Sequence, residues 1–439
     1  MAQDTKIEWA HHTLNPWRGC TKVSAGCANC YAETMSKRNP LTLGIWGPNG
    51  TRVVAAEAMW REPLKWNKAA ACICDGNGDC CVYPSSGGNG HLFHCPQYDR
   101  PRVFCASLAD VFEPWRGPMV DHKGVKLWKC WHSETIKAST GRPNPLYSPL
   151  TMQDVRQRLF DLIDRTQNLD YLLLTKRLEN ISGVNGMPTT LPLKWVANGG
   201  AQFPPNVWIG TSIEDQATAD ERIPHLLRIP AKVRFLSVEP LLGPVKLDLL
   251  RLDAGNPSRC ICGHGHGFTR CPNTGGISQV CSKSGCQRFA RKPGSWTGID
   301  WVIVGGESGR HARPCRIEWI RDIVRQCQAA GVPVFVKQVG SVAIGSEEVC
   351  RFESEQQWIN KARSWLGGIS GGGMRYKPQE QVACFDSLGR RCAIGRDFMQ
   401  ATKDDAYPVI AYRRLDLRDP KGGDPLEWPA DLRVREVAE

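Results

Sequence analysis

Residues 301–336 read WVIVGGESGRHARPCRIEWIRDIVRQCQAAGVPVFV and contain one strand–helix–strand unit. Residues 301–304 (WVIV) and 334–336 (VFV) are continuous apolar runs, which are typical of strands covered on both faces of a parallel sheet. The helix expected over residues 317–330 carries its apolar residues on one face, at Ile317, Ile320, Ile323 and Val324. Gly331 ends this helix just before the second strand.

The same pattern recurs earlier in the chain. Four more apolar runs indicate buried strands: residues 103–106 (VFCA), 171–174 (YLLL), 207–210 (VWIG) and 233–238 (VRFLSV). A second amphipathic helix is expected over residues 152–166, with Val155, Leu159, Leu162 and Ile163 on one face. Repeated strand–helix–strand units predict an α/β fold. A full or partial (β/α) TIM-type barrel fits the number of units, and a doubly wound open sheet is the alternative.

Polar side chains follow these strands directly. They are Ser107 and Asp110, Thr175 and Lys176, Ser212 and Glu214, Glu239, Gly305, Gly306 and Glu307, and Lys337. Barrels and open α/β sheets build their sites at the carboxyl ends of strands, so these residues are the candidate site. For each residue alone, a role in a turn or a helix cap is an equally good explanation.

The composition limits the class of protein. The 439 residues are 41% hydrophobic and 23% charged, which excludes a disordered or fibrous chain. Neither a membrane-spanning apolar run nor a signal peptide is visible, so we expect no membrane partner. The formal charge of +12 permits an anionic partner such as nucleic acid. The 20 cysteines, without a secretion signal, favour metal or redox chemistry over disulfides.

Three of these cysteines lie close together in residues 15–33, NPWRGCTKVSAGCANCYAE. Cys20, Cys27 and Cys30 are spaced C-x(6)-C-x-x-C, and a helix is expected to begin just after Cys30. Thiolates bind iron–sulfur clusters and zinc. Three ligands on a [4Fe–4S] cluster leave one iron open, whereas a closed zinc site needs a fourth ligand, such as His11, His12 or a distant residue. The spacing alone leaves both metals open.

Two further stretches, residues 70–101 and 253–297, are rich in Gly, Cys and His and lack periodicity. Their cysteines are Cys72, Cys74, Cys80, Cys81, Cys95, Cys260, Cys262, Cys271, Cys281 and Cys286. We interpret both as insertions that bind zinc or an auxiliary iron–sulfur cluster, because metal binding can supply the folding energy that such loops lack. The alternatives are one site shared by both insertions, and unliganded thiols. Residues 1–345 would then form the interrupted barrel and residues 346–439 a C-terminal extension packed on it.

Several segments together carry a resemblance to a known family. They are TKIEW (5–9), residues 15–33, LLTKR (173–177), VWIGTSIED (207–215), RFLSVEPLLGPV (234–245), IDWVIVGGESGRHARP (299–314) and GGDPLEWPADLRVRE (422–436). In these segments the chain resembles the phage-borne three-Cys-motif family of radical S-adenosylmethionine (SAM)-like proteins. It departs from the common radical SAM spacing, C-x(3)-C-x-x-C, in its longer first gap.

The resemblance implies a radical SAM barrel in which Cys20, Cys27 and Cys30 hold a [4Fe–4S] cluster whose open iron binds SAM. One electron from an electron donor would cleave SAM to a 5′-deoxyadenosyl radical that abstracts hydrogen from the substrate. The implied substrate is phage DNA, a nucleotide or a base, and the implied location is the host cytoplasm. The implied cofactor-binding residues are Ser107, Asp110, Thr175, Ser212, Glu214, Gly305, Gly306 and Glu307. The candidates for catalysis or substrate contact are Glu239, Lys176 and Lys337.

Two other functions are compatible with the same residues. The first is a zinc-stabilised nucleic-acid-binding protein without catalysis, in which the cysteines bind zinc and the positive charge contacts phosphates. The second is an iron–sulfur redox protein that does not use SAM.

Overall fold

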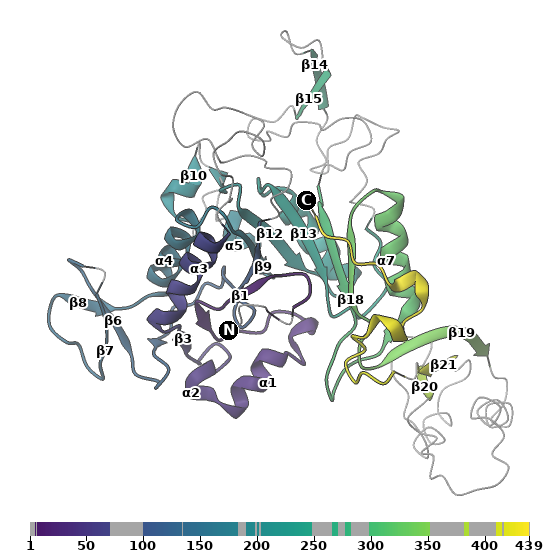
Figure 1. Cartoon of the computed structure of the whole chain (residues 1–439), viewed down its shortest axis with the longest axis horizontal. Helices are drawn as coiled ribbons and strands as arrows, with labels where there is room; N and C mark the ends of the chain where they lie inside the picture. Colours follow the sequence, from purple (N-terminus) through teal and green to yellow (C-terminus); the bar gives the residue numbers. More distant parts are fainter. Residues whose placement is uncertain are drawn as a thin grey trace, which may run out of the picture.

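A parallel sheet of seven strands forms the centre of the protein in the computed structural model (Figure 1). The structure describes residues 5, 7–70, 100–133, 135–182, 190–197, 200–201, 203–247, 266–270, 277–281, 298–351, 382–385, 410–414 and 417–438. The strands are β1 (His12–Leu14), β4 (Arg102–Cys105), β9 (Asp170–Thr175), β12 (Val207–Ser212), β13 (Val233–Val238), β16 (Trp301–Gly305) and β18 (Val334–Gln338). They lie side by side in the order in which they occur in the chain, and every neighbouring pair is parallel.

This strand order decides between the predicted architectures. A doubly wound sheet reverses its strand order at a switch point, whereas this order runs in one direction from β1 to β18. In the part of the chain that the structure describes, β1 and β18 are not paired with each other, so the curled sheet is a half-barrel. The partial-barrel prediction is therefore confirmed at the level of a mixed α/β half-barrel.

The predicted strands and helices are present with shifts of one or two residues at their ends. The two predicted helices are α4 (Met152–Asp164) and α7 (Ile317–Ala329), and the helix expected after Cys30 is α1 (Tyr31–Arg38). The other helices are α2 (Pro40–Leu43), α3 (Glu57–Ala69), α5 (Glu179–Ser182) and α6 (Gln216–Leu227). The strand β1 was not predicted, because His12–Leu14 is too short to show an apolar run.

The two faces of the sheet bury different side chains, because successive residues of a strand point to opposite faces. On one face Val103, Leu173, Ile209 and Val302 pack in the larger core cluster with residues of α4, α6 and α7. On the other face the rings of Trp9, Trp208 and Phe235 gather around Trp301, and Phe104 packs against Trp9. This aromatic cluster fills the curled face near the amino ends of the strands.

Smaller sheets surround the half-barrel. They are formed by β2 (Trp17–Arg18), β3 (Arg52–Val54) and β5 (Met119–Val120); by β6 (Leu127–Cys130), β7 (Ile136–Ala138) and β8 (Tyr147–Pro149); by β10 (Val196–Ala197) and β11 (Gly200–Ala201); by β14 (His266–Arg270) and β15 (Ile277–Cys281); and by β17 (Cys315–Arg316), β19 (Ala343–Arg351), β20 (Val382–Phe385) and β21 (Ile410–Arg414). None of the helices in the described ranges has the length and apolarity needed to cross a bilayer.

The last described segment, residues 417–438, returns to the half-barrel. The backbone N–H of Val336 in β18 donates to the carbonyl of Val434 over 2.8 Å. Trp428 and Leu432 are buried in the larger core cluster. This segment therefore covers the outer edge of β18. Most of both Cys-rich stretches, and residues 352–381 and 386–409 of the predicted extension, lie outside the described residues.

Candidate functional site

The loop that carries Cys20, Cys27 and Cys30 crosses the carboxyl ends of the central strands; we call residues 19–30 the three-Cys loop. At the β4 end, the Tyr31 hydroxyl just after the loop donates to the Ser107 carbonyl over 2.8 Å. Beyond β12, the Ser24 hydroxyl donates to the Glu214 carboxylate over 2.8 Å. Beyond β16, the Asn29 amide donates to the Glu307 carboxylate over 3.1 Å. The loop is thus fastened to strand ends far apart in the sequence.

Two arginines form hydrogen bonds with the first part of the three-Cys loop. The guanidinium of Arg52 is fully buried, donates to both oxygens of Glu113 over 2.7 and 2.8 Å, and donates to the Thr21 hydroxyl over 3.0 Å. Arg177, which follows β9, donates to the Thr21 carbonyl over 2.6 Å and contacts the Cys20 thiol at 3.6 Å. These contacts fix where Cys20 lies.

Asp110 links the ends of β4 and β9. Its carboxylate accepts the Thr175 hydroxyl over 2.7 Å and the Arg177 guanidinium over 2.8 Å, and it also accepts backbone N–H groups. Nearby, Ala106 has a φ of 62°, a left-handed conformation that costs energy for a residue with a Cβ. The strained turn begins the segment that carries Ser107, whose hydroxyl hydrogen-bonds with the Asn15 side chain.

Glu214 holds the middle of the three-Cys loop. Its carboxylate is fully buried and is contacted by Ser24, by Lys176 and, at 3.1 Å, by Arg222. Gly26 lies so close that a Cβ there would stand 2.3 Å from a Glu214 oxygen. The loop packs on this carboxylate without room for a side chain.

Glu307 holds the end of the three-Cys loop. Arg313 donates to both of its oxygens, at 2.7 and 2.9 Å, and reaches the Ala25 carbonyl at 2.9 Å. Burial would raise the pKa of Glu307, but the hydrogen bonds from Arg313 and Asn29 lower it below the ordinary value. Glu307 is therefore an anionic anchor for the loop.

Glu239 and Lys337 form a partly exposed ion pair at the ends of β13 and β18. The Lys337 ammonium donates to both Glu239 oxygens over 2.7 and 2.9 Å, and the Gln338 amide donates to one of them over 3.1 Å. The Lys337 side chain is 31% exposed. Both charges therefore remain within reach of a ligand.

The remaining candidates lie at the strand ends. Ser212 falls on the same face of β12 as Trp208, and Gly305 on the same face of β16 as Trp301, because strand residues alternate. A Cβ on Gly306 would stand 2.3 Å from the Val339 carbonyl oxygen. Packing against the backbone of Val339 therefore leaves no room for a side chain at Gly306.

The three thiols are free, half-buried and differ in acidity. Burial, followed by the charge of Glu113, raises the pKa of Cys20 to about 12, although Arg177 opposes this. Burial would also raise the pKa of Cys27, but hydrogen bonds from Val23 and Ser24 and the charge of Lys176 lower it. Cys27 is therefore the thiol of the three that ionises most readily.

The donor set has consequences for the metal it can bind. Across the residues that the structure describes, no three Cys, His, Asp or Glu side chains are grouped around one metal ion. In a [4Fe–4S] cluster each thiolate binds a different iron, so its ligands are spread around the cluster instead of meeting at one ion. Three free thiols on one anchored loop suit that arrangement.

Of the predicted cysteine ligands in the two insertions, nine lie outside the described residues: Cys72, Cys74, Cys80, Cys81, Cys95, Cys260, Cys262, Cys271 and Cys286. For Cys281, which ends β15, only the backbone is described.

The contacts also reveal site residues that sequence reasoning missed. Ser24, Asn29, Arg52, Arg177 and Arg313 all bind the three-Cys loop or its anchors. Four of them lie within the segments that carry the family resemblance. The sequence by itself, however, does not show which carboxylate or loop residue each side chain contacts. Arg52 lies outside those segments, and only its sheet pairing brings it beneath Thr21.

Comparison with protein families gives one match. Residues 4–133 and 144–376 match the family described as "Protein of unknown function (DUF5131)". The chain belongs to this family. The DUF5131 match includes the three-Cys loop and all strands of the half-barrel, and it omits residues 134–143, which contain β7. No curated protein and no solved structure matches the chain.

Proposed function

We propose that this protein is a radical SAM enzyme that modifies DNA, a nucleotide or a base. One observation carries the proposal: a loop with three free thiols is fastened across the carboxyl ends of a parallel half-barrel. Those ends are where α/β barrels carry out their chemistry. The resemblance of the quoted segments to radical SAM-like proteins supports the same function.

Cys20, Cys27 and Cys30 would hold the [4Fe–4S] cluster, and the donor set fits it. When bound, such a cluster with one iron free of protein ligands supplies the electron that cleaves SAM to a 5′-deoxyadenosyl radical. The lowered pKa of Cys27 favours the thiolate, which is the form that binds metal. Arg177 would stabilise negative charge on Cys20.

The predicted carboxylates divide into two groups. Asp110, Glu214 and Glu307 already accept hydrogen bonds that fasten the strand ends and the three-Cys loop, so we assign them to positioning. Ser212 and Gly305 stay as candidates for contact with SAM. The open pair of Glu239 and Lys337 is the candidate for substrate contact, because a lysine at a strand end can bind an anionic group such as a phosphate.

The decisive experiment is electron paramagnetic resonance of the anaerobically reconstituted and reduced protein, with and without SAM. We expect a [4Fe–4S] signal that changes when SAM is added, and 5′-deoxyadenosine among the products. The Cys27→Ala variant should lose both. A protein that takes up only zinc and binds DNA without cleaving SAM would instead support a zinc-stabilised binding protein. A cluster whose signal does not change when SAM is added would support an iron–sulfur redox protein that does not use SAM.

A further inference from the structure

Arg177 is a buried cation whose guanidinium reaches the sulfur of Cys20. It directly follows Lys176 at the end of β9, and it is only 5% exposed. One terminal nitrogen, Nη1, lies 2.8 Å from an Asp110 oxygen and 3.6 Å from the Cys20 Sγ. The other, Nη2, donates to the Thr21 carbonyl over 2.6 Å. Asp110 and Thr21 therefore fix the direction in which Arg177 donates to the sulfur.

The other two thiols of the three-Cys loop are contacted differently. The Ser24 hydroxyl lies 3.8 Å from the Cys27 Sγ, but its single hydrogen is donated to Glu214 over 2.8 Å. Backbone N–H groups contact the sulfurs of both Cys27 and Cys30. Within the described residues, Cys20 is thus the loop thiol that accepts a hydrogen bond from a cationic side chain.

A second buried arginine lies beside Thr21 and allows a comparison. Arg52 is paired with Glu113 at 2.7 Å, just as Arg177 is paired with Asp110 at 2.8 Å. Each arginine is therefore balanced by its own carboxylate. Arg52 donates to the Thr21 hydroxyl, whereas Arg177 donates to a sulfur. The feature that distinguishes Arg177 is thus an N–H group aimed at a thiol, and not an excess of positive charge.

A hydrogen bond to a ligating sulfur has its largest effect when an iron–sulfur cluster is reduced. Reduction adds one electron, and part of this negative charge falls on the thiolates. A donor at the sulfur therefore stabilises the reduced form more than the oxidised form. Hydrogen bonds to the sulfurs are accordingly among the features that set the reduction potential of such clusters.

We propose that Arg177 raises the reduction potential of the cluster through its hydrogen bond to Cys20, which makes it a positioning residue for the reduction step. The inference rests on the proposed function, because it requires that Cys20 ligates a [4Fe–4S] cluster. In this step one electron passes from a one-electron carrier to the cluster, and no covalent bond of the protein is formed or broken. Arg177 stabilises the added negative charge at the Cys20 sulfur.

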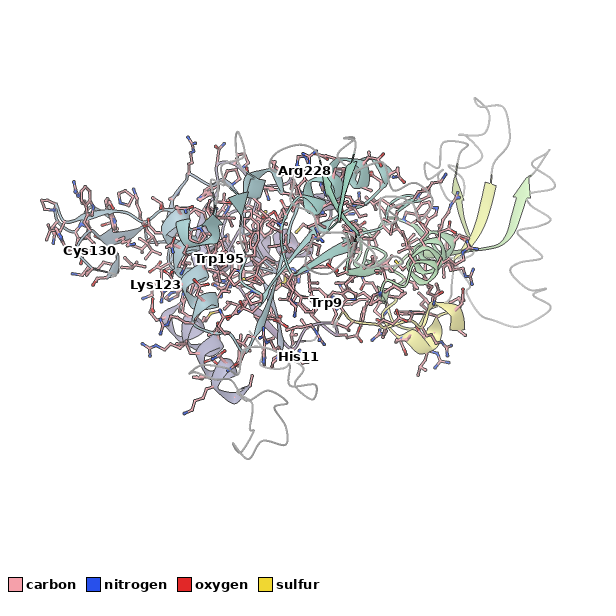
Figure 2. The ribbon with its side chains drawn as sticks, turned by 90° about the horizontal axis from the view of Figure 1, so that it is seen from above. Trp9, His11, Lys123, Cys130, Trp195 and Arg228 are labelled. Atoms are coloured by element: carbon pink, nitrogen blue, oxygen red, sulfur yellow. The ribbon has the colours of Figure 1, made fainter. Side chains whose placement is uncertain are left out.

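The test is a potentiometric titration of the anaerobically reconstituted full-length protein, without SAM, followed by electron paramagnetic resonance. The signal to follow is the one that Cys27→Ala loses and Cys130→Ala keeps. Cys130 serves as the control thiol because, seen from above, it lies at one extreme of the molecule, far from Trp9 in the central sheet (Figure 2). Dithionite supplies the electrons.

The variant Arg177→Met/Asp110→Asn removes the donor together with its paired charge. Replacing both partners avoids leaving an uncompensated buried charge, so the loop keeps a neutral support. We expect the reduction equilibrium to shift about tenfold toward the oxidised cluster, which is a midpoint potential about 59 mV more negative for one electron, because the lost hydrogen bond is charge-assisted.

The matched control is Arg52→Met/Glu113→Gln. It removes the other buried ion pair beside Thr21 with the same change in charge, but Arg52 donates to the Thr21 hydroxyl and not to a thiol. Its midpoint potential should stay close to that of the unaltered protein. Equal shifts in the two double variants, or no shift in Arg177→Met/Asp110→Asn, would overturn the inference.

A second measurement keeps the inference testable if the double variant holds no cluster. Pulsed electron paramagnetic resonance of the reduced protein, grown with nitrogen-15-labelled arginine, should show a weak coupling between the cluster spin and the Arg177 guanidinium. Arg177→Lys, labelled in the same way, should lack this coupling. Its absence from the unaltered protein would show that Arg177 makes no hydrogen bond to the ligating sulfur.

The inference and the radical SAM proposal fail in different ways. The titration contains no SAM, so a cluster whose potential depends on Arg177 but whose signal does not change with SAM overturns only the radical SAM proposal. A cluster that responds to SAM but keeps its potential in Arg177→Met/Asp110→Asn overturns only the inference. A protein that takes up zinc alone overturns both.

Discussion

Ser24 and Glu214, which lie 190 residues apart in the sequence, are joined by a hydrogen bond of 2.8 Å that fastens the three-Cys loop to the segment after β12. Glu214 is fully buried, and Lys176 and Arg222 balance its charge. A buried carboxylate with several donors is a rigid support, because losing one donor leaves charge that water cannot reach. The positions of the thiols therefore depend on the folded half-barrel.

The buried pair of Arg52 and Glu113 should contribute strongly to stability. In Arg52→Ala the Glu113 carboxylate, only 3% exposed, loses both hydrogen bonds from Arg52 and keeps only the more distant Arg177, at 3.7 Å. Removal of one partner of a buried pair costs about 3–5 kcal/mol, and the remaining Arg177 places the expected loss toward the lower end of that range. We expect that loss in the free energy of unfolding measured by urea denaturation. Lys65→Ala, which breaks a pair with Glu62 on the surface of α3, should change it by less than about 1 kcal/mol. Equal effects of the two variants would contradict the assignment.

Cys27 should be the most reactive thiol of the three in the metal-free protein. Its pKa is lowered, whereas the pKa values of Cys20 and Cys30 are raised, and the thiolate is the nucleophile. Alkylation by iodoacetamide near neutral pH, followed by mass spectrometry, should therefore label Cys27 first. Faster labelling of Cys20 would disprove the ordering.

Gly26 should be necessary for the conformation of the three-Cys loop. A Cβ in Gly26→Ala would stand 2.3 Å from Glu214, so the loop must move away from its support. We expect this variant to retain less iron after anaerobic reconstitution, and to unfold at a lower temperature because the buried Glu214 carboxylate loses the Ser24 donor. The control is Gly141→Ala, where an added Cβ meets nothing within 4 Å. Unchanged iron retention in Gly26→Ala would show that the loop tolerates displacement.

Glu307 should make stability depend on pH in the acid range. Its pKa in the folded protein lies below the ordinary value of 4.5, so the unfolded chain binds a proton more readily. The contribution of Glu307 is therefore complete above pH 4.5 and is lost as the pH falls through the lowered pKa. Urea unfolding at several pH values should show Glu307→Gln less stable than the unaltered protein at neutral pH, with the difference shrinking in acid. If the difference in unfolding free energy between the two proteins did not change with pH, the lowered pKa of Glu307 would be contradicted.

Six of the seven central strands could be predicted because each contains a continuous apolar run, such as residues 301–304, which is typical of a strand buried in a parallel sheet. The exception is β1, which is too short to show such a run. The order in which the strands lie in the sheet could not be predicted from those runs. Strand order depends on which edges pair, and this is settled by contacts such as Phe235 with Trp301 across neighbouring strands. The alternation of faces then explains why the aromatic rings share one side.

The amino-acid sequence alone determined that the protein has strands ending in polar residues and one loop with three thiols, because apolar runs and cysteine spacing are properties of the chain itself. Only the tertiary structure decided what those polar residues do. Glu214 and Glu307 accept hydrogen bonds from the three-Cys loop and Asp110 holds Arg177, whereas Glu239 and Lys337 form a partly exposed ion pair. The physical reason is that the role of a charge depends on which partners folding brings within hydrogen-bond distance and on how much water is left around it.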